Sequence, residues 1–254
     1  MTETTITNPV TVADHIVGVP PTVKLGKFLD SKGALASLEE CTIRFTPPNQ
    51  LNDKFDCMPL CYKEVEIDAS WDRSFLSRLF PEQKEYYFES HINRDWKPLM
   101  DSLSNIIGIA SFADLSQCDL QWMWKRYGDG HKGCLILFDA LEMGTFFRVK
   151  YSERPKISIP SDAEKYPVDE VLAVLTTKEF GTSDHWEKES EWRMIGHLSK
   201  LTPKGSLFLR SYNNAFIKVI CGYNMDEVMF KRIVEMADGK GILVEREMAM
   251  CGNG

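Results

Sequence analysis

The stretch Ile106-Ile107-Gly108-Ile109-Ala110-Ser111-Phe112 is a short apolar run, and we expect it to form a strand that is buried on both sides. Working outward from it, shorter runs with strand-like composition or alternation recur along the chain, at 23–29, 41–46, 134–138, 146–151, 192–196, 207–210, 217–221 and 242–244. Helical spacing of apolar residues is confined to a few segments, which include 117–127, 168–178 and 226–237. This pattern predicts an α+β fold with a mixed or antiparallel central sheet.

The chain is expected to be one body with a short N-terminal extension. Residues 1–22 are rich in Thr, Pro and Val without periodicity, which indicates a flexible arm. Residues 23–254 then read as a single α+β domain, and helical spacing between about 71 and 105 predicts a helical insertion within it. Asp30 or Ser31 can cap the first helix, and Asp226 can cap the last one.

Composition excludes several classes of protein. The 254 residues carry 30 Lys and Arg against 37 Asp and Glu, a net charge of −7, which argues against a protein that coats nucleic acid. No run approaches the ~18 apolar residues of a membrane helix, and the first residues lack a secretory pattern, so we expect a cytoplasmic protein without a membrane partner. The seven Cys fit reduced thiols and no metal motif. Nothing in the sequence indicates an oligomeric state.

The stretch Trp186-Glu187-Lys188-Glu189-Ser190-Glu191-Trp192-Arg193 is the most informative about chemistry. If it enters a strand, Glu189, Glu191 and Arg193 share one face, and the residues between them share the other. Two carboxylates placed in this way repel each other unless a cation or a polar substrate lies between them, and one with a raised pKa could act as an acid or a base. The alternative is a solvated strand edge with an internal ion pair.

A second stretch, 122–133, combines aromatic residues with a glycine-rich turn. Trp124 and Tyr127 could stack on a base or a nicotinamide, and His131 lies in a turn whose backbone N–H groups could bind phosphate. Aromatic residues on a helix more often belong to a core, and His131 more often braces a turn.

Other candidates are single residues or loops. Asn52, Asp53 and Asp56 lie in a loop of turn-forming residues, which they could simply brace. Lys27 and Arg44 lie on two early strands, where they could face a cleft or only solvent.

These features occur together in an order that resembles a bacterial and phage family, the domain of unknown function family 2971. The motifs are Lys27-Phe28, a strand into Pro47 and then Leu51-Asn52-Asp53-x-Phe55-Asp56, Ser111-Phe112, Trp124-x-x-Tyr127-x-x-x-His131-x-Gly133, and Lys178 followed by Trp186-x-x-Glu189-x-Glu191-Trp192-Arg193. The resemblance runs from about Lys24 to about Gly222. The chain departs from the family pattern at Lys54, where Pro is usual, and at Phe28, where Tyr is usual.

The layout is also similar to ADP-ribosyltransferase-like folds, and this similarity implies a function. It implies an NAD-consuming transferase or glycohydrolase that acts as a toxin or a phage-defence effector on a nucleotide, nucleic acid or protein acceptor. Glu191 would be catalytic and Glu189 would activate the acceptor, as a carboxylate stabilises developing positive charge. NAD would be held by Lys27, Arg44, Ser111, Trp124, Tyr127 and His131. The acceptor or substrate would contact Asn52, Asp53, Asp56, Lys178 and Arg193.

Two other functions stay open at this stage. One is a non-enzymatic module that binds a nucleotide or another anionic ligand through the aromatic cluster and Arg193. The other is a metal-dependent phosphodiesterase built on Asp53, Asp56, Glu189 and Glu191, although their spacing matches no dedicated metal loop and no metal is expected.

Overall fold

The computed structural model describes residues 23–53, 56–57, 60–61, 100–101, 103–152, 156–157, 168–179 and 185–248. The predicted N-terminal arm and nearly all of the predicted helical insertion lie outside these residues.

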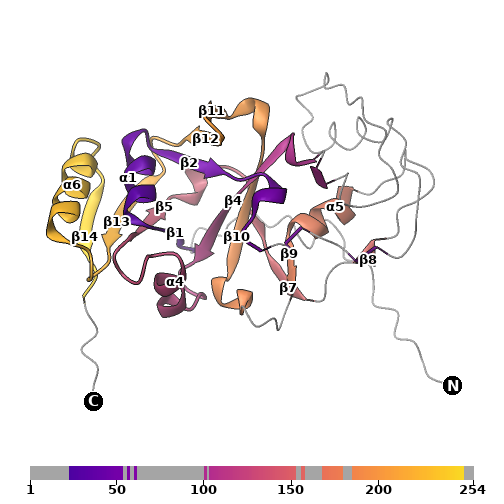
Figure 1. The fold of residues 1–254 in the computed structure, drawn as a ribbon, viewed down its shortest axis with the longest axis horizontal. Coiled ribbons are helices and arrows are strands. Elements are labelled where there is room, and N and C mark those ends of the chain that lie inside the picture. Colours follow the sequence, from indigo (N-terminus) through magenta and orange to yellow (C-terminus); the bar gives the residue numbers. More distant parts are fainter. Residues whose placement is uncertain are drawn as a thin grey trace, which may run out of the picture.

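A seven-stranded sheet forms the centre of the fold (Figure 1), in the order β14-β13-β5-β1-β4-β10-β6. Its strands are β1 (Leu25–Leu29), β4 (Ile107–Asp114), β5 (Cys134–Phe138), β6 (Phe147–Arg148), β10 (Glu191–His197), β13 (Phe216–Cys221) and β14 (Leu243–Arg246). All neighbours are antiparallel except β13 and β14, which are parallel. The sheet is therefore mixed, and the predicted α+β class is confirmed.

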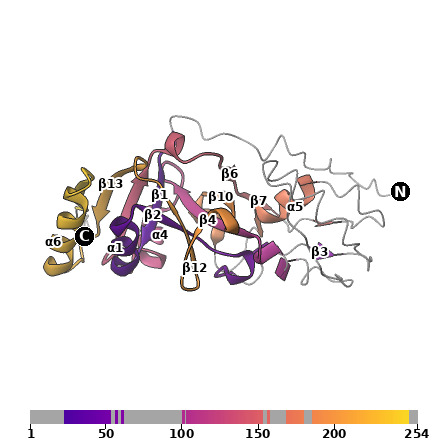
Figure 2. The same cartoon turned by 90° about the horizontal axis from the view of Figure 1, so that it is seen from above.

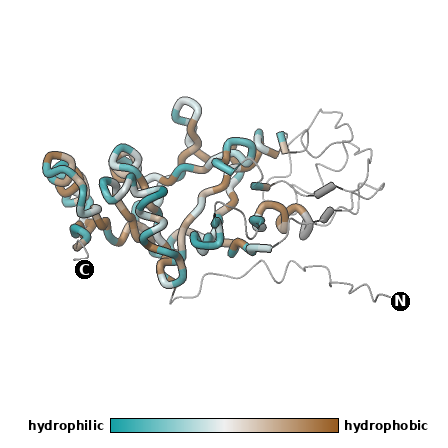
Figure 3. The backbone as a smooth tube through the Cα atoms, turned by 60° about the horizontal axis from the view of Figure 1, so that its bottom comes forward, coloured by the Kyte–Doolittle hydropathy of each residue, from teal (hydrophilic) through white to brown (hydrophobic). Residues whose placement is uncertain are grey.

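Two helices cover one face of this sheet. Helix α1 (Ser31–Glu39) begins after Asp30, whose Oδ1 accepts a hydrogen bond from the Gly33 N–H at 2.6 Å. Helix α6 (Glu227–Asp238) begins after Asp226 in the same way. Both predicted caps are thus present. Their apolar sides pack with alternate residues of β4, β5, β10 and β13 in one core, and Figure 3 shows hydrophobic and hydrophilic stretches alternating around α6.

A three-stranded antiparallel sheet joins the same core. It consists of β11 (Thr202–Lys204), β12 (Leu207–Ser211) and β2 (Thr42–Phe45). Phe45 packs against Gly108 and Gly196, which lie opposite each other on β4 and β10. A Cβ at Gly108 would lie 2.8 Å from the Phe45 Cβ, so glycine is needed there for the close approach. Thr46 then forms a bridge to Ile109, which joins the end of β2 to β4.

Helix α4 (Leu120–Arg126) lies on the opposite face, which also carries the charged side chains described below. Figure 2 shows α5 (Val168–Leu175) and β7 (Lys150–Ser152) toward one end of the molecule, seen from above. The remaining elements are the strands of two parallel pairs, β3 (Leu60–Cys61) with β8 (Lys156–Ile157) and β7 with β9 (Thr177–Glu179), and the 3-10 helices η2 (Pro48–Gln50), η3 (Ala140–Glu142), η5 (Trp186–Glu189) and η6 (Leu198–Lys200).

Two predicted elements differ from the structure. The helix predicted over 168–178 ends at Leu175, and Lys178 lies on strand β9 instead. The β-branched pair Thr176-Thr177 favours this change to extended backbone. The strand predicted over 146–151 divides into β6 and β7, which join different sheets. Among the described residues, no helix is long and apolar enough to cross a membrane.

Candidate functional site

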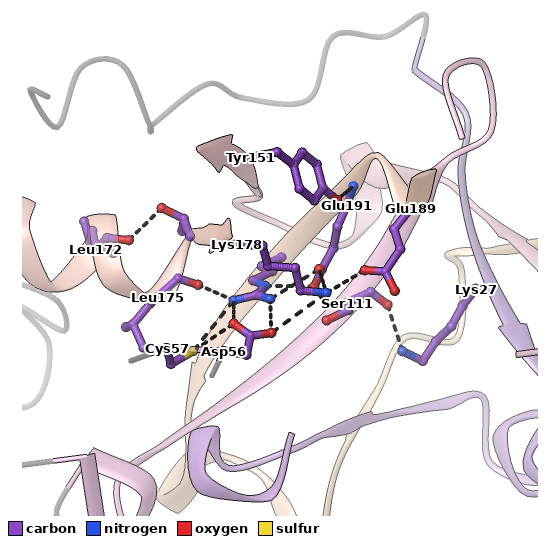
Figure 4. A network of polar contacts seen from close by, with 12 residues as sticks. Lys27, Asp56, Cys57, Ser111, Tyr151, Leu172, Leu175, Lys178, Glu189 and Glu191 are labelled. Carbon is purple, nitrogen blue, oxygen red and sulfur yellow. Dashed lines mark hydrogen bonds and ion pairs between the residues drawn. The ribbon is translucent and has the colours of Figure 1, made fainter. Parts of the chain in front are cut away.

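Five charged side chains meet in one buried network on the α4 face of the sheet (Figure 4). They come from four segments: the loop after η2, strand β9, the end of η5 and strand β10. The members are Asp56, Lys178, Glu189, Glu191 and Arg193. None is more than 7% exposed, so water screens their interactions only weakly. We call this set the charged network.

Arg193 is the centre of the network and is fully buried. Its Nη1 and Nη2 donate to the two carboxylate oxygens of Asp56 at 2.9 and 2.6 Å. Its Nε donates to Glu191 Oε1 at 2.8 Å, and its Nη1 also donates to the Leu175 carbonyl at 2.6 Å, at the end of α5. Burial alone would lower the pKa of Arg193, but the carboxylates of Asp56 and Glu191 raise it well above its ordinary value.

Lys178 provides the cation that the two nearby glutamates require. Its Nζ lies 2.5 Å from Glu189 Oε2, 2.7 Å from Glu191 Oε2 and 3.8 Å from Asp56 Oδ2. Burial opposes its charge, yet the three carboxylates raise the pKa of Lys178 well above its ordinary value. Its Nζ also lies 4.8 Å from the centroid of the buried Trp186 ring, which is an additional cation–π contact.

The environments of Glu189 and Glu191 push their pKa values apart. Burial raises the pKa of Glu189 above its ordinary value, although Lys178 and the Tyr127 hydroxyl oppose this. Burial acts in the same direction on Glu191, but there Arg193 and Lys178 outweigh it and hold the pKa well below the ordinary value. Glu191 is therefore the fixed anion and Glu189 is the carboxyl that can hold a proton, a separation typical of acid and base pairs.

Two tyrosine hydroxyls complete the surroundings of these glutamates. Tyr127, at the C-terminal cap of α4, donates its O–H to Glu189. Tyr151, on β7, accepts a hydrogen bond from the Glu191 N–H at 2.9 Å. Burial is the main reason that the pKa of each phenol is raised, so both stay neutral around physiological pH.

Lys27 lies at a gap in the sheet beside the network. Strand β1 pairs with β4 only at Leu25 and Gly26, and beyond this point the Lys27 Nζ donates to the Ser111 carbonyl at 2.8 Å. Burial lowers the pKa of Lys27 to about 8. The negative charge of Glu191 acts to raise this pKa, and the positive charge of the exposed Arg44 lowers it further. Lys27, Ser111 and Glu191 come from three strands that are neighbours in the sheet, β1, β4 and β10, and it is the backbone of Ser111 that contacts Lys27.

Trp124 and His131 lie in a separate cluster. Trp124 is 3% exposed and packs between the rings of Phe28 and His131, each with its centroid 5.2 Å away. His131 also contacts the Tyr223 ring, and its Nδ1 lies 2.7 Å from Glu247 Oε2. The structure therefore places both residues in packed positions outside the charged network, which agrees with the core and turn roles considered as alternatives.

Of the three candidate residues in the loop after η2, one belongs to the charged network and two do not. Asp56 joins the network, whereas Asn52 is exposed and Asp53 is half-buried. The Asp53 carbonyl accepts a hydrogen bond from the Asp56 N–H at 3.1 Å, so Asp53 contacts the network residue Asp56 through its backbone.

The expected alternation along β10 is present. Glu191 and Arg193 point into the network, while Trp192 and Met194 belong to the core on the other face. Glu189 reaches the network differently, because η5 precedes the strand and Ser190 has φ of 44° between them. The solvated-edge alternative does not fit, since β10 lies between β4 and β6. Sequence reasoning missed Tyr151 and Cys57, whose Sγ lies 3.7 Å from Arg193 Nη1.

The three acidic residues of the network already share two protein cations. In the part of the chain that the structure describes, no group of three or more His, Cys, Asp or Glu side chains is arranged to hold a metal ion. The phosphodiesterase alternative would require a metal to displace Lys178 or Arg193 from these carboxylates.

No protein-family model matches this chain, and searches of curated proteins and of solved structures give no match either. The family resemblance described above therefore stays a prediction, and functional arguments rest on the site alone.

Proposed function

We propose that this protein cleaves NAD at the bond between nicotinamide and ribose, as an ADP-ribosyltransferase or an NAD glycohydrolase. The observation that carries the proposal is the charge of the network: three buried carboxylates face two cations, a balance of 2 − 3 = −1 when all are ionised. The nicotinamide ring of NAD is positively charged, and this charge passes to the ribose as the bond breaks. A surplus of buried negative charge beside the ribose would stabilise the positive charge that develops there in the transition state.

Each residue has a distinct part in the proposed reaction. Glu191, whose low pKa keeps it ionised, supplies the constant negative charge beside the ribose. Glu189, with its raised pKa, accepts the proton of the attacking hydroxyl or water as the new bond to ribose forms and neutral nicotinamide leaves. Lys27 beside β4, together with the exposed Arg44 of β2 whose charge acts on it, would bind the pyrophosphate.

The family resemblance extends this proposal to a biological role. A toxin or phage-defence effector would modify a protein, nucleic acid or nucleotide, and would work in the cytoplasm, where NAD is abundant. The net charge of −7 favours a small or protein acceptor over a long nucleic acid.

The test is to incubate the purified protein with NAD and to measure free nicotinamide by chromatography. Glu189→Gln is the decisive variant, because Glu191 holds Arg193 and its replacement would disturb the fold. We expect Glu189→Gln to lower nicotinamide release by about 100-fold or more. Glu247→Gln, which changes a carboxylate bonded to His131 outside the network, is the control and should retain activity. The proposal is overturned if the unmodified protein releases no nicotinamide from NAD.

One observation favours a second candidate, a module that binds a nucleotide without reaction. Every carboxylate of the network already contacts a protein cation, an arrangement that suits a rigid binding site as well as a catalytic one. Such a module would be stabilised against heat by NAD or ADP-ribose in a saturable way, with no nicotinamide formed.

A further inference from the structure

Two buried thiols face each other across neighbouring strands, and neither belongs to the charged network. Cys134 on β5 and Cys221 on β13 are directly opposite in the antiparallel register, and their Sγ atoms are 3.9 Å apart. Both residues are fully buried. Two thiols in contact can be joined by oxidation into a disulfide.

The backbone around the pair has the geometry that a disulfide needs. The Cys221 carbonyl accepts a hydrogen bond from the Glu247 N–H at 2.7 Å, on the β14 side, and so points away from β5. The next pair is hydrogen bonded, because the Gly222 N–H donates to the Gly133 carbonyl at 2.9 Å. Cys134 and Cys221 are therefore a non-hydrogen-bonded pair, for which the Cα atoms lie about 4.5 Å apart. This separation is within the range of disulfides.

We propose that Cys134 and Cys221 are a site of oxidative modification, at which a peroxide converts the two thiols into a reversible disulfide between β5 and β13.

The reaction is balanced with one peroxide per pair. The contact between the two thiols lowers the pKa of the Cys221 thiol, chiefly through its hydrogen bond with Cys134, and so favours the Cys221 thiolate. The Cys221 thiolate attacks the peroxide O–O bond, forms a sulfenic acid and releases hydroxide. The Cys134 sulfur then displaces the sulfenic oxygen, which leaves as water after taking up a proton. In sum, two thiols and one hydrogen peroxide give one disulfide and two waters.

The disulfide would strengthen a region that other contacts already hold together. It would close a chain loop between residues 87 positions apart, which restricts the unfolded state. It also lies directly beside the turn 128–133, where Asn224 donates its N–H to the His131 carbonyl and Glu247 contacts the His131 ring. We expect the oxidised protein to unfold several degrees higher than the reduced protein.

The experiment treats the reduced full chain with hydrogen peroxide, blocks remaining thiols with iodoacetamide and maps peptides by mass spectrometry without reduction. The expected product is one linked peptide pair containing Cys134 and Cys221, lighter by two hydrogen atoms, that dithiothreitol separates. The control is Cys118→Ser, which changes a half-buried thiol just before helix α4. It should leave the link and the upward shift in melting temperature unchanged.

Cys221→Ser should remove both the link and the shift. If this variant fails to fold, the map of the unmodified protein still decides. Sulfinic or sulfonic acids on Cys134 and Cys221 without a link, unmodified thiols at both positions, or a link between either residue and another cysteine would each overturn the proposal.

Discussion

Replacing Arg193 by Met tests whether the charged network is as tightly buried as the structure indicates. The change keeps an apolar stem but removes the guanidinium, so the side-chain donors to Asp56 and Glu191 are lost together with that to the Leu175 carbonyl. The charge of the network falls from 2 − 3 = −1 to 1 − 3 = −2, with Lys178 as its remaining cation. Loss of one partner from a buried ion pair costs about 3–5 kcal/mol, and we expect Arg193→Met to lower the free energy of unfolding by this amount.

The assay is urea unfolding followed by circular dichroism at neutral pH. Arg246→Met is the matched control, because Arg246 pairs with Glu227 at the surface, with exposed side-chain fractions of 35% and 60%. Surface pairs contribute at most about 1 kcal/mol, so the control should differ little from the unmodified protein. A loss at Arg193 no larger than the control would refute the reasoning, since it would mean that water reaches and screens the network.

A double variant separates the charge from the packing. Asp56→Asn in the Arg193→Met background removes one of the two carboxylates left without a guanidinium, and restores the charge of the network to 1 − 2 = −1. We expect the double variant to be more stable than the sum of the single losses predicts, because the two groups interact directly. Strictly additive losses would contradict the direct pairing.

Three further predictions concern residues around the network. Tyr127→Phe keeps the ring but removes the O–H donated to Glu189, and should lower the free energy of unfolding by about 1.5–3 kcal/mol in urea titrations; no loss would exclude this bond. The pKa of Lys27 is about 8 in the folded protein and 10.5 ordinarily, so between these pH values the unfolded state binds more protons than the folded state. The free energy of unfolding should therefore rise with pH across this range, relative to that of Lys27→Met. A difference between the two proteins that does not change with pH would contradict the pKa shift. Trp124→Ala should cost about 3–5 kcal/mol as a core truncation, whereas a small loss would place the ring outside the core.

Local patterns predicted much of the fold, because strands and caps depend on neighbouring residues. The limits of β5 were predicted at both ends, from Cys134 to Phe138, and the Asp30 and Asp226 caps formed as expected. Alternation along β10 correctly placed Glu191 and Arg193 on one face.

The site itself depends on contacts that no local pattern specifies. Asp56 and Arg193 are 137 positions apart, and their pairing follows from how a turn and a central strand meet in the folded chain. Lys178 was expected at the end of a helix, where its direction would differ; the change to strand β9 sets it beside Tyr151 and between the glutamates. Trp124 was ambiguous because helical spacing does not say which side of a short helix meets Phe28.

The charge of the site also limits what it can bind. The network carries one surplus negative charge when all five of its groups are ionised. Lys27 is the neighbouring cation, and its pKa of about 8 leaves it partly protonated around neutral pH. A cationic group that enters beside Glu191 would repel the Lys27 ammonium and lower its pKa further. Binding of such a ligand should therefore release protons between pH 7 and 8, and binding of an anion to Lys27 should take protons up. Calorimetry in buffers of different ionisation enthalpy measures this proton exchange. If nicotinamide analogues with a quaternary ring nitrogen release protons when they bind, the surplus negative charge of the network is supported. If they take up protons or exchange none, it is refuted.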